Sequence, residues 1–217
     1  TGSSNKPLSY IAGIEKGMLF TSTFLPDIPV KFGTYEPQNA EGLEMNYEEV
    51  NQKNFLSNML RQSRNRPAVV AADMMGVDMM VEMYQRLGLS SFKTRKDVGI
   101  SAVLGAVEVK PAEQFNAYAV LANKGKYNPL QPILKILDRD GKVVWEFKPD
   151  GGKQVVDERA AYLVTDMLYD YAGDTVKGLK GYPAAAKTGT SDNNKDMYFI
   201  GYTPEIVTGI FVGNNNN

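Results

Sequence analysis

The chain has 217 residues, of which 43% are hydrophobic and 23% are charged, and this composition is ordinary for a globular protein of one large or two small domains. Its net charge of −1 gives no electrostatic reason to expect nucleic acid or an anionic membrane as a partner, and no apolar run approaches the length of a membrane span. The chain has no Cys, which excludes thiol nucleophiles and disulfides. It also has no His, which removes the usual general base and the commonest metal ligand. We therefore expect no metal or cofactor.

A serine enzyme of this composition has to use a lysine or a carboxylate as its base. The first predicted helix begins near Ser3 or Ser4 and ends at Gly17, with Pro7 in or beside its first turn. Ser3 and Lys6 are three residues apart and therefore share a face of this helix. The electropositive helix start favours ionisation of a serine and disfavours the charged form of a lysine. A lone Ser-x-x-Lys is nevertheless more often a capping serine with a solvated lysine.

Residues 18–45 contain several Pro and Gly residues and predict a long irregular surface segment. Asn46 is expected to cap the next helix, which carries Val50 and Phe55 on its apolar face and ends at Gln62.

A short turn between two helices follows. Pro67 suits the first position of a helix over Ala68–Met75, which leaves Ser63 and Asn65 in the preceding turn. Both side chains can project from such a turn into a cleft, although simple turn and capping chemistry is the more common role of these residues.

The remaining elements are predicted from hydrophobic periodicity and from Gly, Pro and Asp signals at their ends. They are a helix from Pro111 to Gly125, a hairpin of 132–137 and 143–147, a helix capped by Asp157 and ended by Gly173, and strands over 184–190, 197–202 and 206–212.

The first of these strands ends in Lys187, Thr188, Gly189 and Thr190. Lys187 supplies a cation, the two threonine hydroxyls are donors to carboxylate oxygens, and Gly189 lets a ligand backbone approach the strand. The run is a plausible cradle for an extended peptide with a free carboxylate, but taken alone it is more often a strand-end turn. Strand alternation does not decide which of Lys187 and Thr190 faces the cleft.

Three weak motifs thus occur in a fixed order: Ser3-x-x-Lys6, Ser63-x-Asn65 and 187–190. In this order they resemble the transpeptidase domain of class A penicillin-binding proteins. The resemblance covers nearly the whole chain, and it extends to the stretches 2–7, 63–69, 104–109 and 199–204.

The resemblance implies a role for each residue of the first two motifs. Ser3 would be the acylated nucleophile and Lys6 the base that activates it. Ser63 and Asn65 would relay a proton and orient the substrate amide.

The resemblance also implies roles along the third motif. Lys187 would set the electrostatics, and Thr188 and Thr190 would grip the terminal carboxylate beside Gly189. The backbone N–H groups of Ser3 and Thr190 would form the oxyanion hole.

The fold implied is α+β, with an antiparallel sheet flanked by helices, in one domain over 1–217 with a small hairpin insertion at about 131–148. The function implied is that of a serine D,D-transpeptidase that cross-links peptidoglycan stem peptides ending in D-Ala-D-Ala and is inhibited covalently by β-lactams. A D,D-carboxypeptidase, a β-lactamase, and a β-lactam-binding sensor or catalytically silent module are the alternatives. The expected location is extracytoplasmic, with a membrane anchor and a glycosyltransferase domain upstream.

The sequence departs from the family pattern in several places. Asn5 stands where the family usually has a bulky apolar residue, and Ala186 replaces the more frequent Gly before the lysine. The strands that precede the nucleophile helix in this family, and the helix that follows the last strand, are not found, so we expect a domain truncated at both ends. Because 206–212 is an apolar strand, we expect further strands from upstream to pair with its edge.

Overall fold

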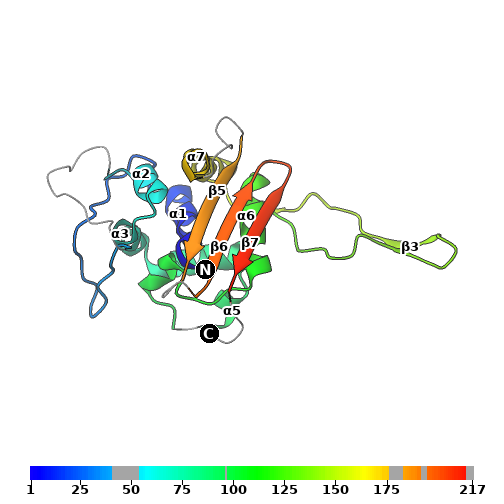
Figure 1. The fold of residues 1–217 in the computed structure, drawn as a ribbon, viewed down its shortest axis with the longest axis horizontal. Helices are drawn as coiled ribbons and strands as arrows, with labels where there is room; N and C mark the ends of the chain where they lie inside the picture. The colour runs from blue at the N-terminus through cyan, green and yellow to red at the C-terminus, as the bar shows by residue number, and fades with distance from the viewer. Residues whose placement is uncertain (41–53, 96, 176–182, 192–194, 214–217) are drawn as a thin grey trace.

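The computed structural model describes residues 1–40, 54–95, 97–175, 183–191 and 195–213 (Figure 1). Its helical elements are η1 (Gly2–Asn5), α1 (Lys6–Glu15), α2 (Leu56–Arg61), α3 (Asn65–Met75), α4 (Val77–Arg86), α5 (Ser91–Thr94), η4 (Ile100–Leu104), α6 (Pro111–Ala122) and α7 (Glu158–Thr175). Its strands are β1 (Lys126–Tyr127), β2 (Lys135–Leu137), β3 (Val143–Glu146), β4 (Lys153–Gln154), β5 (Ala185–Thr190), β6 (Met197–Tyr202) and β7 (Val207–Val212).

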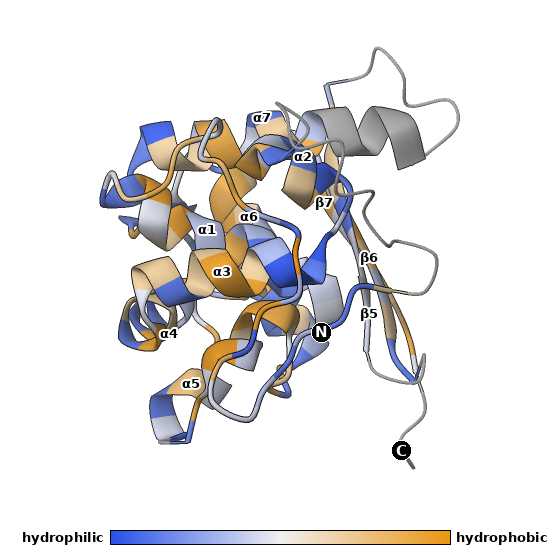
Figure 2. Ribbon diagram, turned by 90° about the vertical axis from the view of Figure 1, so that its left-hand side faces the viewer, coloured by the Kyte–Doolittle hydropathy of each residue, from blue (hydrophilic) through white to orange (hydrophobic). Residues whose placement is uncertain are grey.

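The strands β5, β6 and β7 form an antiparallel sheet in that order. Along β6 the buried side chains are those of Tyr198, Ile200 and Tyr202, which alternate with more exposed neighbours, so the sheet buries one face. The described helices lie on that side of the sheet (Figure 2). Within the described residues β5 and β7 are the outer strands, and Ile210 and Val212 of β7 are exposed. The α+β architecture expected from the sequence is confirmed.

The central helix of the core is α1. Every residue from Lys6 to Gly13 is buried, and the helix packs against α3, α4 and α7. A helix that is buried on all sides cannot show a one-sided apolar stripe, and its polar residues need partners inside the protein. Lys6 enters the core at the first turn of this helix.

A two-stranded hairpin, β2 paired with β3, extends away from the helices and the sheet (Figure 1). All residues of both strands are exposed, and the hairpin agrees with the predicted pairing of 132–137 with 143–147. A second pair, β1 with β4, forms at its base and was not predicted from the sequence.

Several predicted helix ends shift in the structure. The first helix begins as the 3-10 turn η1, and α1 itself ends at Glu15, two residues before Gly17. The helix α7 continues past Gly173 to Thr175, because one glycine inside a helix costs only about 1 kcal/mol. The predicted capping residue Asn46 lies outside the described residues. The prediction that places Phe55 inside that helix is wrong, because Phe55 is extended and bridges Phe24, and the helix α2 begins only at Leu56.

Candidate active site

The turn that carries Ser3 is held by close backbone contacts on two sides. Gly2 has a φ of +57°, and a Cβ placed on it would lie 2.2 Å from the carbonyl oxygen of Thr190 in β5. On the other side, a Cβ on Gly105 would lie 2.3 Å from the backbone nitrogen of Gly2. Because neither site has room for a side chain, the turn lies directly between β5 and the residues that follow η4.

The structure separates the two adjacent serines. Ser4 is fully buried, and its hydroxyl donates a hydrogen bond of 2.8 Å to the carbonyl oxygen of Thr1. Ser3 is only half-buried, so its hydroxyl is the one accessible to a ligand. Ser3 therefore remains the predicted nucleophile.

The side chain of Lys6 joins the first two motifs. Its Nζ lies 2.5 Å from the carbonyl oxygen of Ser63, 2.7 Å from Oδ1 of Asn65 and 3.4 Å from Oγ of Ser63. Burial lowers the pKa of Lys6 well below its usual value, the charge of Lys187 lowers it further, and the carboxylate of Asp27 opposes the shift. A neutral Lys6 can accept a proton, as a base must.

The third motif reaches the same place from β5. Lys187 is fully buried, and its Nζ donates to Oγ of Ser63 at 3.0 Å and to the carbonyl oxygen of Thr188 at 3.2 Å. Burial lowers the pKa of Lys187 to about 7. The hydroxyl of Ser63 therefore lies between two buried lysines and can exchange a proton with either.

The structure also resolves the alternation along β5. The side chain of Lys187 reaches Ser63, and Gly189, two residues on, faces the Ser3 turn, because a Cβ there would lie 2.2 Å from the carbonyl oxygen of Thr1. Thr188 and Thr190 alternate with these two residues, and Thr190 is exposed. Lys187 is thus the member of the run whose side chain reaches Ser63, whereas Thr190 lines the groove beside the Ser3 turn.

Two residues that sequence reasoning missed support the Ser63 turn. Asn39 Oδ1 accepts hydrogen bonds from the backbone N–H groups of Asn65 at 2.9 Å and of Arg66 at 3.4 Å, and so caps α3 from a distant part of the chain. Its Nδ2 donates to Oδ1 of the buried Asp27 at 2.8 Å. This non-local cap explains why α3 begins at Asn65 and not at the predicted Pro67. Both residues come from the segment expected to be an irregular surface excursion, where no sequence signal marked them.

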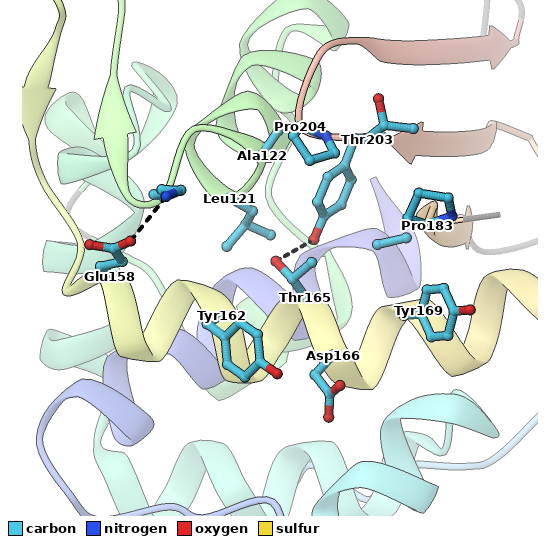
Figure 3. Close-up of a pocket in the computed structure, with 13 residues that line it drawn as sticks. Leu121, Ala122, Glu158, Tyr162, Thr165, Asp166, Tyr169, Pro183, Thr203 and Pro204 are labelled. Carbon is cyan, nitrogen blue, oxygen red and sulfur yellow. Dashed lines mark hydrogen bonds and ion pairs between the residues drawn. The ribbon is translucent and has the colours of Figure 1, made fainter. Parts of the chain in front are cut away.

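A groove of about 800 Å³ runs past the Ser3 turn. Gly2 and Thr190 line it on one side, and residues 104–109 line it on another. A second cavity, of about 420 Å³, lies between α7 and the opposite end of β5, where Tyr162, Tyr169 and Pro183 contribute to its wall (Figure 3). None of the predicted site residues lines the second cavity, so it is separate from the candidate active site.

Comparison with known proteins places this geometry in a family. Residues 1–216 match the family described as "Penicillin binding protein transpeptidase domain". "Penicillin-binding protein 1A" of Neisseria meningitidis serogroup A is 30% identical over 227 residues, which cover 98% of this chain and 27% of the relative. "Penicillin-binding protein 1A" of Aquifex aeolicus is 33% identical over 217 residues, which cover 98% of this chain and 29% of the relative. The chain thus spans less than a third of the length of these curated relatives.

Solved structures show the same fold. The penicillin-binding protein 1A structure from Haemophilus influenzae has a TM-score of 0.79 and 26% identity, over 99% of this chain and 38% of that one. The PonA1 protein of Mycobacterium tuberculosis in complex with penicillin V has a TM-score of 0.84 and 24% identity, over 98% of this chain and 60% of that one. By its family match and by its relatives, the chain belongs to the penicillin-binding protein transpeptidase family.

Proposed function

We propose that this chain is the catalytic part of a serine D,D-transpeptidase that acts on peptidoglycan stem peptides ending in D-Ala-D-Ala. The observation that carries the proposal is the position of Ser63 Oγ, within 3.4 Å of Lys6 Nζ and 3.0 Å of Lys187 Nζ. All three motifs meet there, and the two lysines have lowered pKa values. Strongly perturbed pKa values at a site with a serine nucleophile indicate catalysis.

In the proposed reaction, Ser3 Oγ attacks the carbonyl carbon of the penultimate D-Ala while neutral Lys6 takes its proton. The bond from that carbon to the nitrogen of the terminal D-Ala then breaks, and the proton passes through Ser63 Oγ to the leaving amine. An amine of a neighbouring stem peptide attacks the acyl-enzyme, and the proton that this amine loses returns to Ser3. The negative charge on the carbonyl oxygen is stabilised by the backbone N–H groups of Ser3 and Thr190.

The terminal carboxylate of the substrate would bind along β5. Protonated Lys187 supplies the charge, and the hydroxyls of Thr188 and Thr190 supply hydrogen bonds. The absence of a side chain at Gly189 lets the strand and the Ser3 turn lie close together, because a Cβ there would lie only 2.2 Å from the carbonyl oxygen of Thr1. An extended peptide can then pair with the outer edge of β5 as an added strand.

The rival β-lactamase reaction needs a carboxylate that activates a water for deacylation. Among the residues that the structure describes, a buried carboxylate close to the site is that of Asp27, which accepts a hydrogen bond from Asn39 and pairs with Arg64 at 3.4 Å. A carboxylate engaged in this way supports the Ser63 turn and is poorly placed to activate water. We therefore expect a long-lived β-lactam adduct, with covalent inhibition as the result.

The reaction would take place outside the cytoplasmic membrane, where peptidoglycan is assembled. Among the described residues, no helix combines the length and the apolar character that crossing a bilayer requires.

Intact-mass measurement after penicillin treatment, followed over hours, tests the proposal. We expect one stable adduct, mapped to Ser3 and lost in Ser3→Ala but kept in Ser4→Ala. Rapid return to the free mass would indicate a β-lactamase, and no adduct would refute the nucleophile. Incubation of the wild-type chain with a D-Ala-D-Ala peptide and an acceptor amine then separates transpeptidation from hydrolysis and from a silent β-lactam sensor.

A further inference from the structure

Two amide side chains are buried beneath the Ser3 turn, and the proposed reaction leaves them without a role. Asn5, one of the departures from the family pattern, and Gln114 of α6 are both fully buried. Gln114 Nε2 donates to Asn5 Oδ1 at 3.0 Å, and Asn5 Nδ2 donates to the carbonyl oxygen of Ala102 in η4 at 3.2 Å. The pair therefore connects α6, η1 and η4 through directional contacts.

The same helix also holds the residue next to Ser3. Gln114 Nε2 donates to Oγ of Ser4 at 3.1 Å, and the hydroxyl of Tyr118 donates to the carbonyl oxygen of Ser4 at 2.7 Å. Ser4 Oγ in turn donates to the carbonyl oxygen of Thr1. Both residues that follow Ser3 are thus fixed from α6, while Gly2, before it, is fixed against β5 and Gly105.

A buried amide pair is a costly way to fill this space. Burying polar groups costs free energy that hydrogen bonding only partly returns, and an apolar pair of similar volume would fill the same space without that cost. What amides provide and apolar side chains lack is direction, because each donor fixes the orientation of its acceptor. Here the acceptor atoms of Ser4 and Asn5 belong to the turn that sets the position of Ser3. The same turn sets the rotation of α1 about its axis, and with it the direction of the Lys6 side chain.

We infer that Asn5 and Gln114 are positioning residues that hold Ser3 and Lys6 in register for acylation; the inference rests on the function proposed above. A nucleophile displaced by about 1 Å loses on the order of a hundredfold in rate. Both amides are fully buried and out of a ligand's reach, so non-covalent ligand binding should change little. We expect the pair to affect the rate constant of acylation and not the affinity of the non-covalent complex.

The test is a cycle of three variants made in the intact protein that contains these residues: Asn5→Leu, Gln114→Met and the two together. Stopped-flow acylation by a fluorescent penicillin gives the rate constant of the chemical step separately from the dissociation constant of the non-covalent complex, and urea unfolding gives stability. Asn5→Leu removes one of the two acceptors of Gln114 Nε2, and Gln114→Met removes the donor to Asn5 Oδ1, so each single variant leaves a buried amide with one hydrogen bond fewer. Both stability and the acylation rate should therefore fall, the rate by about tenfold to a hundredfold. The double variant removes both amides, so its stability should recover while its acylation rate stays low. In all three variants the dissociation constant of the non-covalent complex should remain within about twofold of the wild type.

A matched control lies at the other end of β5. Tyr202→Phe removes one buried hydrogen bond, from the tyrosine hydroxyl to Thr165 Oγ1 at 3.0 Å (Figure 3), and should lower stability without slowing acylation. If acylation of the double variant recovers together with its stability, or if folded Gln114→Met acylates as fast as the wild type, the pair is only a structural filler and the inference is wrong. If the wild-type protein itself forms no adduct on Ser3, the proposed function fails and this inference fails with it. Measurement of the wild type therefore tests the function, and the variants test only the inference.

Discussion

Removal of the Asn39 side chain tests whether this residue, which is distant in sequence, holds the Ser63 turn in place. In Asn39→Ala the first two N–H groups of α3 lose their acceptor, and the buried carboxylate of Asp27 loses a donor at 2.8 Å. Loss of a helix cap costs about 1 kcal/mol, and loss of a hydrogen bond to a charged group costs about 1.5–3 kcal/mol. Because the two losses share one side chain and need not add, we expect the free energy of unfolding to fall by about 2–4 kcal/mol.

The same substitution should also slow acylation. Asn65 Oδ1 lies 2.7 Å from Lys6 Nζ, and the turn that presents Asn65 is held by Asn39. A turn that relaxes by a fraction of an ångström separates Lys6 from Ser63 and Asn65, so the rate constant for acylation should drop at least tenfold in protein that is still folded.

Urea unfolding and stopped-flow acylation by a fluorescent penicillin measure the two effects on the same samples. The matched control is Asn116→Ala, which removes one amide hydrogen bond, to the carbonyl oxygen of Asn128 at 3.0 Å, far along the chain from the Ser63 turn. It should cost less than about 1 kcal/mol and leave acylation unchanged. An Asn39→Ala variant with wild-type stability and wild-type acylation would refute the reasoning.

Three further predictions concern the site itself. Lys6→Arg keeps a positive charge but has no accessible neutral form, so the acylation rate should fall by orders of magnitude in folded protein, and a near wild-type rate would point to another base. Because burial lowers the pKa of Lys187 to about 7, its positive charge is present below that pH and is lost above it, so the rate of acylation by a β-lactam that carries a carboxylate should decline as pH rises through about 7. A ligand without a carboxylate should not show this decline. If Lys187→Gln slows acylation by both ligands equally, Lys187 serves proton relay instead. Gly189→Ala places a Cβ 2.2 Å from the carbonyl oxygen of Thr1 and should reduce acylation more than tenfold, whereas Gly99→Ala, whose Cβ would meet its nearest neighbour at 4.0 Å, should acylate normally.

Local sequence signals predicted the elements that carry the three motifs. The Ser3-x-x-Lys6 spacing and Pro7 indicated the start of a helix, and the apolar runs of 197–202 and 206–212 indicated the two strands beside β5. These predictions held because a proline in the first turn of a helix and the alternation of apolar residues along a strand act between residues that are near in sequence. The order of the three motifs then indicated one site.

What the sequence could not predict depends on contacts between distant segments. Asn39 caps α3 from 26 residues away, and Gln114 reaches Asn5 from 109 residues away. Polar residues of these types are usually exposed, and nothing in their neighbourhood in sequence marks them as buried. The same limit applies to β5, where only the contacts with distant segments show that the Lys187 side chain reaches Ser63 and that Thr190 lines the groove beside the Ser3 turn.

The two buried lysines also connect binding to chemistry. The charge of Lys187 lowers the pKa of Lys6, and both amines hydrogen-bond to Ser63 Oγ. A ligand carboxylate near Lys187 favours the charged form of Lys187 and so raises its pKa. A Lys187 that is held charged in turn favours the neutral form of Lys6, which is the form that can accept the proton of Ser3. On this reasoning a substrate carboxylate does more than add affinity, since its binding shifts the two lysines toward the protonation states that acylation requires.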